Sequence, residues 1–421
     1  MAKNKIIEVR LFDEEVGRIG FDEHRLTSSF QFNPEFLASN QLINAFPKTG
    51  VLKRTPIAQI FNRFNGETFK GLAPIFADSL PDHFGSIIFK TWLSHKENKQ
   101  INILEQLAYI GNRGMGAIEY SPRKMLPKNT TIDLDEMIDV LREVLNLKKS
   151  SKEGSMNSKA LLNIFKIGSS AGGARPKIIV SEHKETGKII PGDLEVSNAY
   201  HHYLIKLAIE EEANYPREVI EFCYYQMLQK IGIRMMDSKL IDGKHFATLR
   251  FDRQNGEKQH ALTATGLTGW DYKDATDSSY ENLFRLCSFL KVKHSQMEEL
   301  FKRMVFNVVF RNTDDHLKNH SFIYNREKER WTLSPAYDVT YALNPLVDFK
   351  KAPRTLSINE KRTNITLADV LKVADDFTIN NPKGIIKLVQ AQKPYLKDLL
   401  KQHDISKKVS ESIIENIIPL I

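Results

Sequence analysis

The sequence predicts an α+β fold in which strands and helices alternate up to about residue 253 and helices dominate the remainder. Residues 6–20 alternate apolar and polar side chains around the turn-forming segment 13–15, a pattern typical of a β-hairpin. Residues 297–308 instead repeat apolar side chains at helical intervals, which indicates one buried helix face. A chain of 421 residues is long enough for two or three core-forming units.

The composition is that of an ordinary globular protein, with 41% hydrophobic and 27% charged residues. No apolar run approaches the ~18 residues that a bilayer-spanning helix needs, and the first residues lack the apolar core of a signal peptide. Two cysteines are too few for a disulfide framework, so we expect a reduced, cytoplasmic protein. The net charge of +8 permits contact with DNA or RNA, although diffuse use of lysine explains it equally well.

The first 120 residues carry predicted elements but no recognisable catalytic set of side chains. After the hairpin, residues 30–32 predict a further strand. Residues 34–38, 84–95 and 101–109 predict helices, the last of them followed by a glycine-rich turn. We therefore interpret this part of the chain as an interaction or regulatory module.

A glycine-rich segment, residues 168–177, follows a predicted helix at 133–147 and a polar linker at 148–155. Glycine backbone beside an apolar strand, ending in Arg175 and Lys177, is what a phosphate-binding loop requires, because bare N–H groups can approach the phosphate closely. The segment matches neither the Walker A pattern nor the kinase G-x-G-x-x-G pattern. A plain glycine hairpin is therefore the alternative.

A single cation, Lys206, lies within the apolar strand predicted at 201–208. In kinases a lysine on such a strand contacts the α- and β-phosphates of the nucleotide, whereas a lysine on an exposed strand edge is the alternative. The helix predicted at 216–230 offers Glu218 and Glu221 as partners for this cation.

The segment around Asp314 carries the side chains that phosphoryl transfer needs. Asp314 and Asn319 have the spacing of the catalytic Asp and metal-binding Asn in the kinase loop H-R-D-x-x-x-x-N. Asp338 follows a hairpin predicted from residues 321–324 and 330–333 and supplies a second carboxylate. One carboxylate that accepts a proton and two oxygen ligands for Mg²⁺ form the minimal set. Taken alone, the pattern also fits a helix cap and a turn.

These motifs become specific when they are taken together and in order. They make the sequence resemble the HipA family, which comprises serine/threonine kinases that act as toxins of bacterial toxin–antitoxin pairs. The resemblance covers nearly the whole chain, and it is carried by segments 168–177, 204–207, 250–253, 312–319 and 335–338.

The resemblance implies a protein-kinase-like two-lobe fold with an extra N-terminal α/β module and an all-helical C-terminal lobe. The implied domains are the N-terminal module at 1–120, a kinase N-lobe with its glycine-rich loop at 121–253, and the helical C-lobe at 254–421.

The resemblance also assigns roles to individual residues. Asp314 is expected to be the catalytic base, and Asn319 and Asp338 the Mg²⁺ ligands. The strand predicted at 246–253 is expected to form the hinge that contacts adenine, with Asp252 contacting or supporting the ribose. The implied ATP-binding residues are Gly172, Gly173, Ala174, Arg175, Pro176, Lys177, Lys206, Leu249, Arg250, Phe251, Asp252 and His316.

Ser170 matches the inhibitory autophosphorylation site of the family, and the neighbouring Ser169 is an alternative. Either residue could instead be a turn-forming serine that is not modified. A phosphate there adds about two negative charges to a loop that must itself hold phosphates, so its ejection is physically reasonable. Kinases carry Asp-Phe-Gly where this chain has Asp338-Val339-Thr340, so the sequence does not imply control by a flipping phenylalanine.

The partners implied by the resemblance are ATP, Mg²⁺ and a HipB-like DNA-binding antitoxin, which would bring the chain to operator DNA. An aminoacyl-tRNA synthetase is the candidate protein substrate. Three rival hypotheses remain at this point: a noncatalytic corepressor of the antitoxin, a small-molecule kinase, and a metal hydrolase that uses Asp314, His316 and His320. The last lacks an H-E-x-x-H motif or a cysteine pair.

Overall fold

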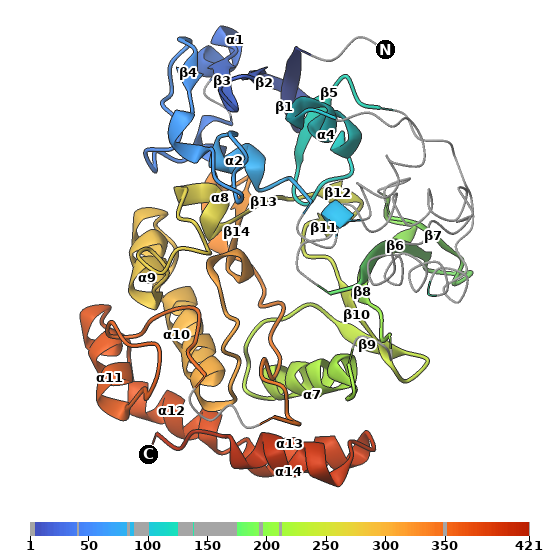
Figure 1. Cartoon of the computed structure of the whole chain (residues 1–421), viewed down its shortest axis with the longest axis vertical. Coiled ribbons are helices and arrows are strands. Elements are labelled where there is room, and N and C mark those ends of the chain that lie inside the picture. The colour runs from blue at the N-terminus through green and yellow to red at the C-terminus, as the bar shows by residue number, and fades with distance from the viewer. Residues whose placement is uncertain are drawn as a thin grey trace. The chain divides into compact units, whose positions relative to one another are not determined.

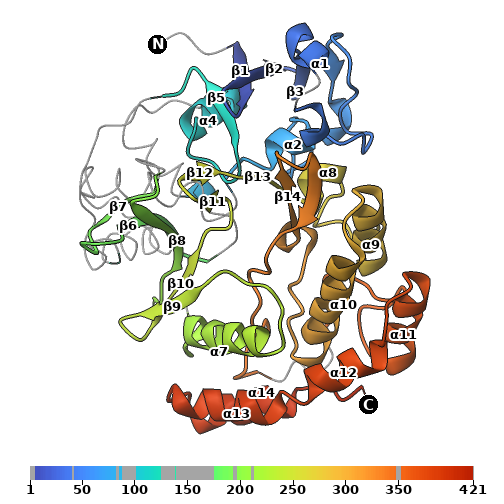
Figure 2. The same ribbon diagram turned by 180° about the vertical axis from the view of Figure 1, so that it is seen from behind.

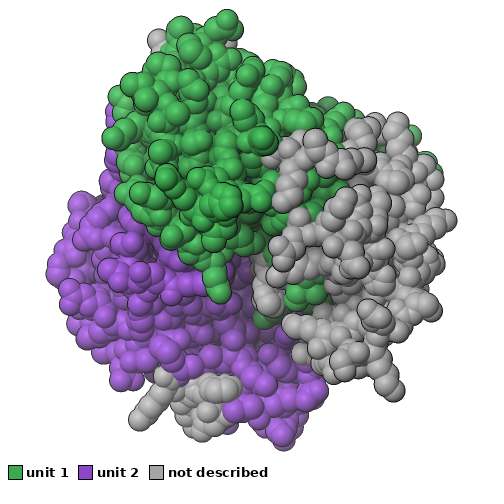
Figure 3. All heavy atoms as spheres, turned by 45° about the horizontal axis from the view of Figure 1, so that its top comes forward, with its two compact units in different colours: residues 1–212, 247–261 green, residues 213–246, 262–421 purple. Residues whose placement is uncertain are grey.

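The structure is a computed structural model, and it divides into two compact units. Unit 1 contains residues 1–212 and 247–261, and unit 2 contains residues 213–246 and 262–421 (Figure 3). The expected three-part division at residues 120 and 253 stays a prediction. The residues that the structure describes are 5–39, 42–81, 85–87, 101–124, 138, 175–192, 197–209, 213–347 and 352–420.

The first sheet of unit 1 is antiparallel and has the strand order β4-β3-β2-β1-β5. The predicted hairpin is confirmed as β1 and β2, and apolar side chains such as Ile7, Val9 and Leu11 point alternately into the core. Helix α4 packs against β1 and β5 and ends at Gly111. The strands are β1 (Ile6–Leu11), β2 (Glu14–Asp22), β3 (Thr27–Phe32), β4 (Gln59–Ile60) and β5 (Ile118–Ser121), and the helices are α1 (Pro34–Ser39), η1 (Ile43–Ala45), η2 (Asn62–Phe64), α2 (Pro74–Ala77) and α4 (Ile103–Ile110).

The second sheet of unit 1 runs in the order β7-β6-β8-β10 (Figure 1). The apolar strand predicted at 201–208 is confirmed as β8, which pairs with β6 along its whole length. The strand predicted at 246–253 ends at Leu249, because the chain then turns to bury the charged side chains that follow. The elements are β6 (Lys177–His183), β7 (Ile189–Pro191), β8 (Tyr200–Lys206), β10 (His245–Leu249, which enters the unit at Ala247), β11 (Arg253–Gln254) and β12 (Glu257–Lys258).

Unit 2 is mainly helical, and its central element is the predicted helix, now α10. The side chains of Leu300, Phe301, Met304 and Val305 are fully buried, as their spacing predicted. Helix α10 packs against α9 and α12, and α13 packs against α7; Figure 2 shows these helices from behind. The helices are α7 (Arg217–Lys230), α8 (Ala264–Thr268), α9 (Tyr280–Phe289), α10 (His294–Val309), η4 (Leu317–Asn319), α11 (Leu367–Asp376), α12 (Pro382–Gln390), α13 (Lys393–Gln402) and α14 (Lys407–Glu415).

A small sheet accompanies these helices, so the C-terminal part is helical with strands and not all-helical as expected. The predicted hairpin is confirmed as β14 and β15, and β13 joins it in the order β13-β14-β15. The amide of Ala264, just after β13, donates to the carbonyl of His320, just before β14. The strands of this unit are β9 (Ser238–Ile241), β13 (His260–Thr263, with Leu262 and Thr263 in unit 2), β14 (Ser321–Asn325) and β15 (Arg330–Leu333).

Several expectations fall on residues that the structure does not describe. The helices predicted at 84–95 and 133–147, the linker at 148–155 and the glycines of segment 168–174 lie largely or wholly outside the described residues. None of the helices in the described part of the chain has the length and apolar character needed to cross a membrane.

Replacement of Leu300 by alanine is expected to lower the free energy of unfolding by about 2–5 kcal/mol, because it leaves a cavity in place of a fully buried side chain. Urea denaturation followed by circular dichroism measures this change. Ser295→Ala, on the exposed face of the same helix, is the matched control and is expected to stay within about 0.5 kcal/mol of the wild type. Equal losses from both substitutions would contradict the assignment of the buried face.

Candidate active site

The loop after α10 holds the predicted base and one predicted metal ligand next to each other. The side-chain nitrogen Nδ2 of Asn319 donates a hydrogen bond of 2.9 Å to the backbone carbonyl of Asp314. The side chain of Asp314 is exposed, and η4 begins two residues after the neighbouring Asp315. The spacing recognised in the sequence thus closes a tight loop that presents one carboxylate to solvent.

The chain around Asp338 is tied to the same loop. The hydroxyl of Tyr337 donates to the carbonyl of Lys318 over 2.7 Å and lies 2.5 Å from the hydroxyl of Ser321. Asp338 follows directly and has a φ of 56°, a left-handed conformation that Asp tolerates better than most residues. The structure therefore brings Asp314, Asn319 and Asp338 into one region of unit 2.

Asp315 anchors this loop from beneath. Its side chain is 1% exposed, and its Oδ2 accepts a hydrogen bond of 2.6 Å from the hydroxyl of Tyr280 and another from Arg354. The amide of Asn307 donates to the Tyr280 hydroxyl over 2.9 Å and accepts from Asn312 over 3.1 Å. Two consecutive aspartates therefore have different surroundings, one exposed and one locked into a buried network.

Sequence reasoning missed this network. The pair Asp314-Asp315 could have suggested that one carboxylate is structural, but nothing local in the sequence distinguishes the two. The partners Tyr280 and Arg354 lie 35 and 39 residues away along the chain. Burial raises the pKa of Tyr280 well above its ordinary value, and the negative charge of Asp315 raises it further, so the hydroxyl stays protonated and continues to donate.

The two histidines of the loop have different positions. His320 is buried against the ring of Tyr280, and burial lowers its pKa to about 4, so the imidazole is neutral at physiological pH. The ring of His316 contacts that of Tyr272, with centroids 5.0 Å apart. Within the described ranges, no three His, Cys, Asp or Glu side chains gather in a way that would hold a metal ion.

In unit 1, two predicted phosphate-binding cations face each other across neighbouring strands. Lys177 on β6 is the register partner of Lys206 on β8, and the two residues are only 3% and 4% exposed. This burial excludes the alternative that Lys206 lies on an exposed strand edge. Two ammonium groups on directly opposite residues repel each other. An anion bound beside both of them would reduce this repulsion. Arg175 and Pro176 lead into β6, and the carbonyl of Pro176 accepts from the amide of Leu207 over 3.0 Å.

The acidic partners predicted for Lys206 lie on one helix. Glu218 and Glu221 are buried on α7, in unit 2, so their pairing with Lys206 stays a prediction. The residues Gly172, Gly173, Ala174, Ser169 and Ser170 lie outside the described residues.

The segment expected to form the hinge carries a buried ionic network. Asp252 is 0% exposed and accepts from Nε and Nη2 of Arg250 over 2.9 and 2.7 Å, and from Nη1 of Arg253 over 2.9 Å. It also accepts from the amide of Gly116 in the N-terminal part over 2.7 Å. These four hydrogen bonds show that Asp252 supports the segment, and its contact with the ribose stays a prediction.

This network joins two parts of unit 1 that are distant in sequence. Arg253 donates to the carbonyls of Gly114 and Gly116, each over 2.9 Å, and the ammonium of Lys258 donates to the carbonyl of Asn112 over 2.6 Å. Gly116 has a φ of 76°, and a Cβ there would meet the carbonyl oxygen of Ala261 at 2.7 Å. The glycine-rich turn predicted after 101–109 is therefore a docking point for residues 252–261.

Comparisons with known proteins agree with this arrangement. The model of the HipA-like C-terminal domain matches residues 169–398, and that of the HipA N-terminal domain matches residues 7–121. The chain belongs to the HipA family. The described network of Asp252 consequently connects the two family domains, because Gly116 lies in the first and residues 250–253 lie in the second.

One solved structure, a complex that contains HipA, supports the same fold. The chain is similar to the Shewanella oneidensis MR-1 toxin–antitoxin system, a complex of HipA, HipB and operator DNA, with 13% identity, a TM-score of 0.63, and coverage of 97% of this chain and 94% of that chain. The Helicobacter pylori proinflammatory kinase CtkA matches with 10% identity over 58% of this chain and 87% of that chain, at a TM-score of only 0.38. No curated protein matches the sequence significantly. The family models and the Shewanella oneidensis structure together confirm the expected α+β fold of the HipA family.

Replacement of Asp252 by asparagine is expected to lower the free energy of unfolding by about 3–5 kcal/mol, because it leaves two buried guanidinium groups without their carboxylate. Chemical denaturation of the full chain measures the change. Glu35→Gln, which alters an exposed carboxylate in the same unit, is the control and is expected to shift the value by no more than about 0.5 kcal/mol.

The stability lost in Asp252→Asn is expected to depend on pH. Burial alone would raise the pKa of Asp252, but the guanidinium groups of Arg250 and Arg253 outweigh burial and hold this pKa well below its usual range. Its stabilising contribution is therefore complete above the unfolded-state pKa of about 3.9 and is lost as the pH falls further. The stability gap between wild type and Asp252→Asn is expected to narrow below about pH 4, and a constant gap would contradict this account.

Proposed function

We propose that this HipA-family chain is an ATP- and Mg²⁺-dependent protein serine/threonine kinase. The observation that carries the proposal is the pair of adjacent aspartates, in which Asp315 is locked by Tyr280 and Arg354 while Asp314 stands exposed beside Asn319. A preorganised carboxylate on a rigid support is what a general base needs, because its position must not change when the substrate binds.

Asp314 accepts the proton of the attacking hydroxyl in this proposal. The Asn319 side chain suits a magnesium ligand, because its nitrogen already donates to the Asp314 carbonyl and its oxygen is left to point toward a cation. Asp338 supplies the second magnesium ligand from the segment that Tyr337 ties to this loop. A bound Mg²⁺ would neutralise charge on the phosphates during transfer.

In this proposal the phosphates of the nucleotide bind to residues of unit 1. Lys177 and Lys206 supply a buried pair of cations for its phosphates, and the loop that contains Gly172, Gly173 and Ala174 would cover them together with Arg175 and Pro176. The adenine would contact backbone groups between Leu249 and Phe251. The amide of Arg250 in this segment donates a hydrogen bond of 2.8 Å to the carbonyl of His202. His316, in unit 2, is proposed as a further ATP-binding residue.

The biological role proposed is that of a toxin that arrests growth by phosphorylating a cytoplasmic protein, with an aminoacyl-tRNA synthetase as the candidate substrate. The similar Shewanella oneidensis protein was solved with HipB and operator DNA, which supports a HipB-like antitoxin as the partner here. Phosphorylation of Ser170, or of the adjacent Ser169, would inhibit the enzyme by adding negative charge to the nucleotide-covering loop. The domain borders proposed are those at residues 120 and 253.

Replacement of Asp314 by asparagine is expected to lower the rate of phosphate transfer from labelled ATP to a bacterial lysate by about 10²–10⁴-fold, the usual contribution of a general base. Asp398→Asn, which changes an exposed carboxylate on α13, is expected to retain full activity. Phosphoproteomics of cells that express each variant identifies the substrate. Undiminished transfer by Asp314→Asn would overturn the assignment, and a wild type that binds ATP and operator complexes without turnover would favour the noncatalytic corepressor.

A further inference from the structure

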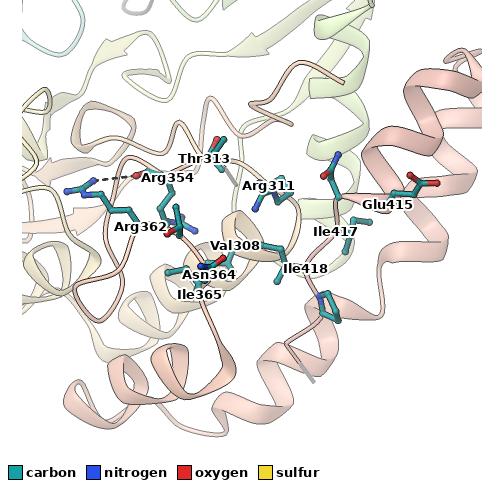
Figure 4. Close-up of a pocket in the computed structure, with 14 residues that line it drawn as sticks. Val308, Arg311, Thr313, Arg354, Arg362, Asn364, Ile365, Glu415, Ile417 and Ile418 are labelled. Carbon is teal, nitrogen blue, oxygen red and sulfur yellow. Dashed lines mark hydrogen bonds between the residues drawn. The ribbon is translucent and has the colours of Figure 1, made fainter. Parts of the chain in front are cut away.

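A cavity of about 300 Å³ lies in unit 2, on the side of the catalytic loop that carries Thr313. Its lining separates into two groups in Figure 4, with Arg354, Thr313 and Arg311 on one side and Ile365, Val308 and Ile418 on the other. The volume is at the small end of the range for ligand pockets, which suits a small charged group and is too small for a nucleotide.

Positive charge is concentrated in the wall of this cavity. Three arginines line it, Arg311, Arg354 and Arg362, and the first two are only 8% and 5% exposed. The one acidic residue in the lining, Glu415, is exposed and lies on α14, apart from the arginines in Figure 4. Asp315 offsets part of this charge through its contact with Arg354.

Hydrogen bonds hold the side chains of Arg354 and Arg362 in place, and they leave one nitrogen of Arg354 available to a ligand. Arg354 donates through Nε to the carbonyl of Leu356 over 2.8 Å and through Nη2 to Asp315. Among the described residues its Nη1 has no hydrogen-bond partner, and this atom is not one of those buried away from solvent. Arg362 donates through Nη2 to the carbonyls of Ala275 and Ser278, over 2.6 and 3.0 Å.

The backbone of Arg311 is a second, independent observation. This residue has a φ of 61°, a conformation that costs a non-glycine residue free energy and is retained mostly at functional positions. The amide of Ala342 holds it by donating to its carbonyl over 3.2 Å. Burial lowers the pKa of Arg311, and the nearby charge of Arg354 lowers it further, so the two cations disfavour each other.

We propose that this cavity is a binding site for a phosphate group, either free phosphate or the phosphate of a phosphorylated side chain. Guanidinium groups are suited to phosphate because their N–H groups match its oxygens in paired hydrogen bonds. The apolar wall formed by Val308, Ile365 and Ile417 would accommodate the carbon atoms next to an esterified phosphate. A bound anion would relieve the repulsion between Arg311 and Arg354.

The site also has a direct connection to the proposed catalytic loop. Arg354 contacts both the cavity and Asp315, and the amide of Thr355 donates to the carbonyl of Thr313 over 2.8 Å. A ligand that fixes Arg354 therefore also fixes the residue that supports Asp314. A ligand that binds only the folded state stabilises the protein by an amount that increases with the logarithm of its concentration once this exceeds the Kd, so binding is expected to raise the melting temperature.

The test measures binding to the full chain by isothermal titration calorimetry, with inorganic phosphate, O-phospho-L-serine and acetate as probes and without nucleotide. We expect both phosphates to bind and to raise the melting temperature, and acetate to do neither. Tighter binding of O-phospho-L-serine would identify a phosphorylated side chain as the natural ligand, and tighter binding of inorganic phosphate would identify the free anion. If neither inorganic phosphate nor O-phospho-L-serine binds at about 10 mM, the proposal is overturned.

Substitutions locate the binding event. Arg311→Met and Arg362→Met are each expected to weaken phosphate binding by about tenfold or more, because each removes a charged donor from the cavity wall. Arg285→Met, at an exposed arginine outside the cavity, is the matched control and is expected to bind as the wild type does. Circular dichroism verifies folding, and the two cavity variants are independent tests if one of them fails to fold.

The proposed nucleotide site also attracts phosphate, so Lys206→Met distinguishes the two locations. Retained binding in Lys206→Met together with loss in Arg311→Met supports the cavity. The opposite result, with loss in Lys206→Met and full binding in both cavity variants, would overturn it. Because the assay contains no ATP and reads no phosphate transfer, its outcome is separate from the success or failure of the kinase proposal.

Discussion

The candidate site depends on one buried interaction, the contact of the Asp315 carboxylate with the hydroxyl of Tyr280 and the guanidinium of Arg354. A buried carboxylate without partners would cost several kcal/mol, so its donors fix its position closely. Tyr280 begins α9 and Arg354 lies in the segment after β15, so three distant stretches of unit 2 meet at one oxygen atom. Because Asp314 directly precedes Asp315, its backbone is held wherever this contact holds Asp315.

Unit 1 uses the same physical device at Asp252, where one fully buried carboxylate is bound by two arginines and a backbone amide. The result is a connection between the HipA N-terminal and C-terminal domains through Gly116. The N-terminal part, expected as an interaction module, is therefore also a structural support for the proposed nucleotide hinge. The buried charge of Asp252 favours one packing of these two domains, because a shifted packing would leave charges buried and unpaired.

Local patterns identified much of this molecule in advance. The alternation at 6–20 and the helical spacing at 297–308 were sufficient for β1, β2 and α10, because one-sided burial imposes a fixed period on each type of element. The hairpin of β14 and β15 was predicted for the same reason. The end of β10 was placed too late, since Arg250 and Asp252 leave the strand to satisfy partners that are distant in sequence.

The sequence by itself determined the family, the elements and the residue types available for phosphoryl transfer, because these depend on short-range spacing and on ordered motifs. Only the tertiary structure decided which of two adjacent aspartates is exposed, that Lys177 and Lys206 are opposed across two strands, and that Asp252 is buried between two arginines. The physical reason is that burial and the balance of charge are properties of the surroundings. Those surroundings are assembled from residues such as Tyr280, Arg354 and Gly116, whose positions no local pattern specifies.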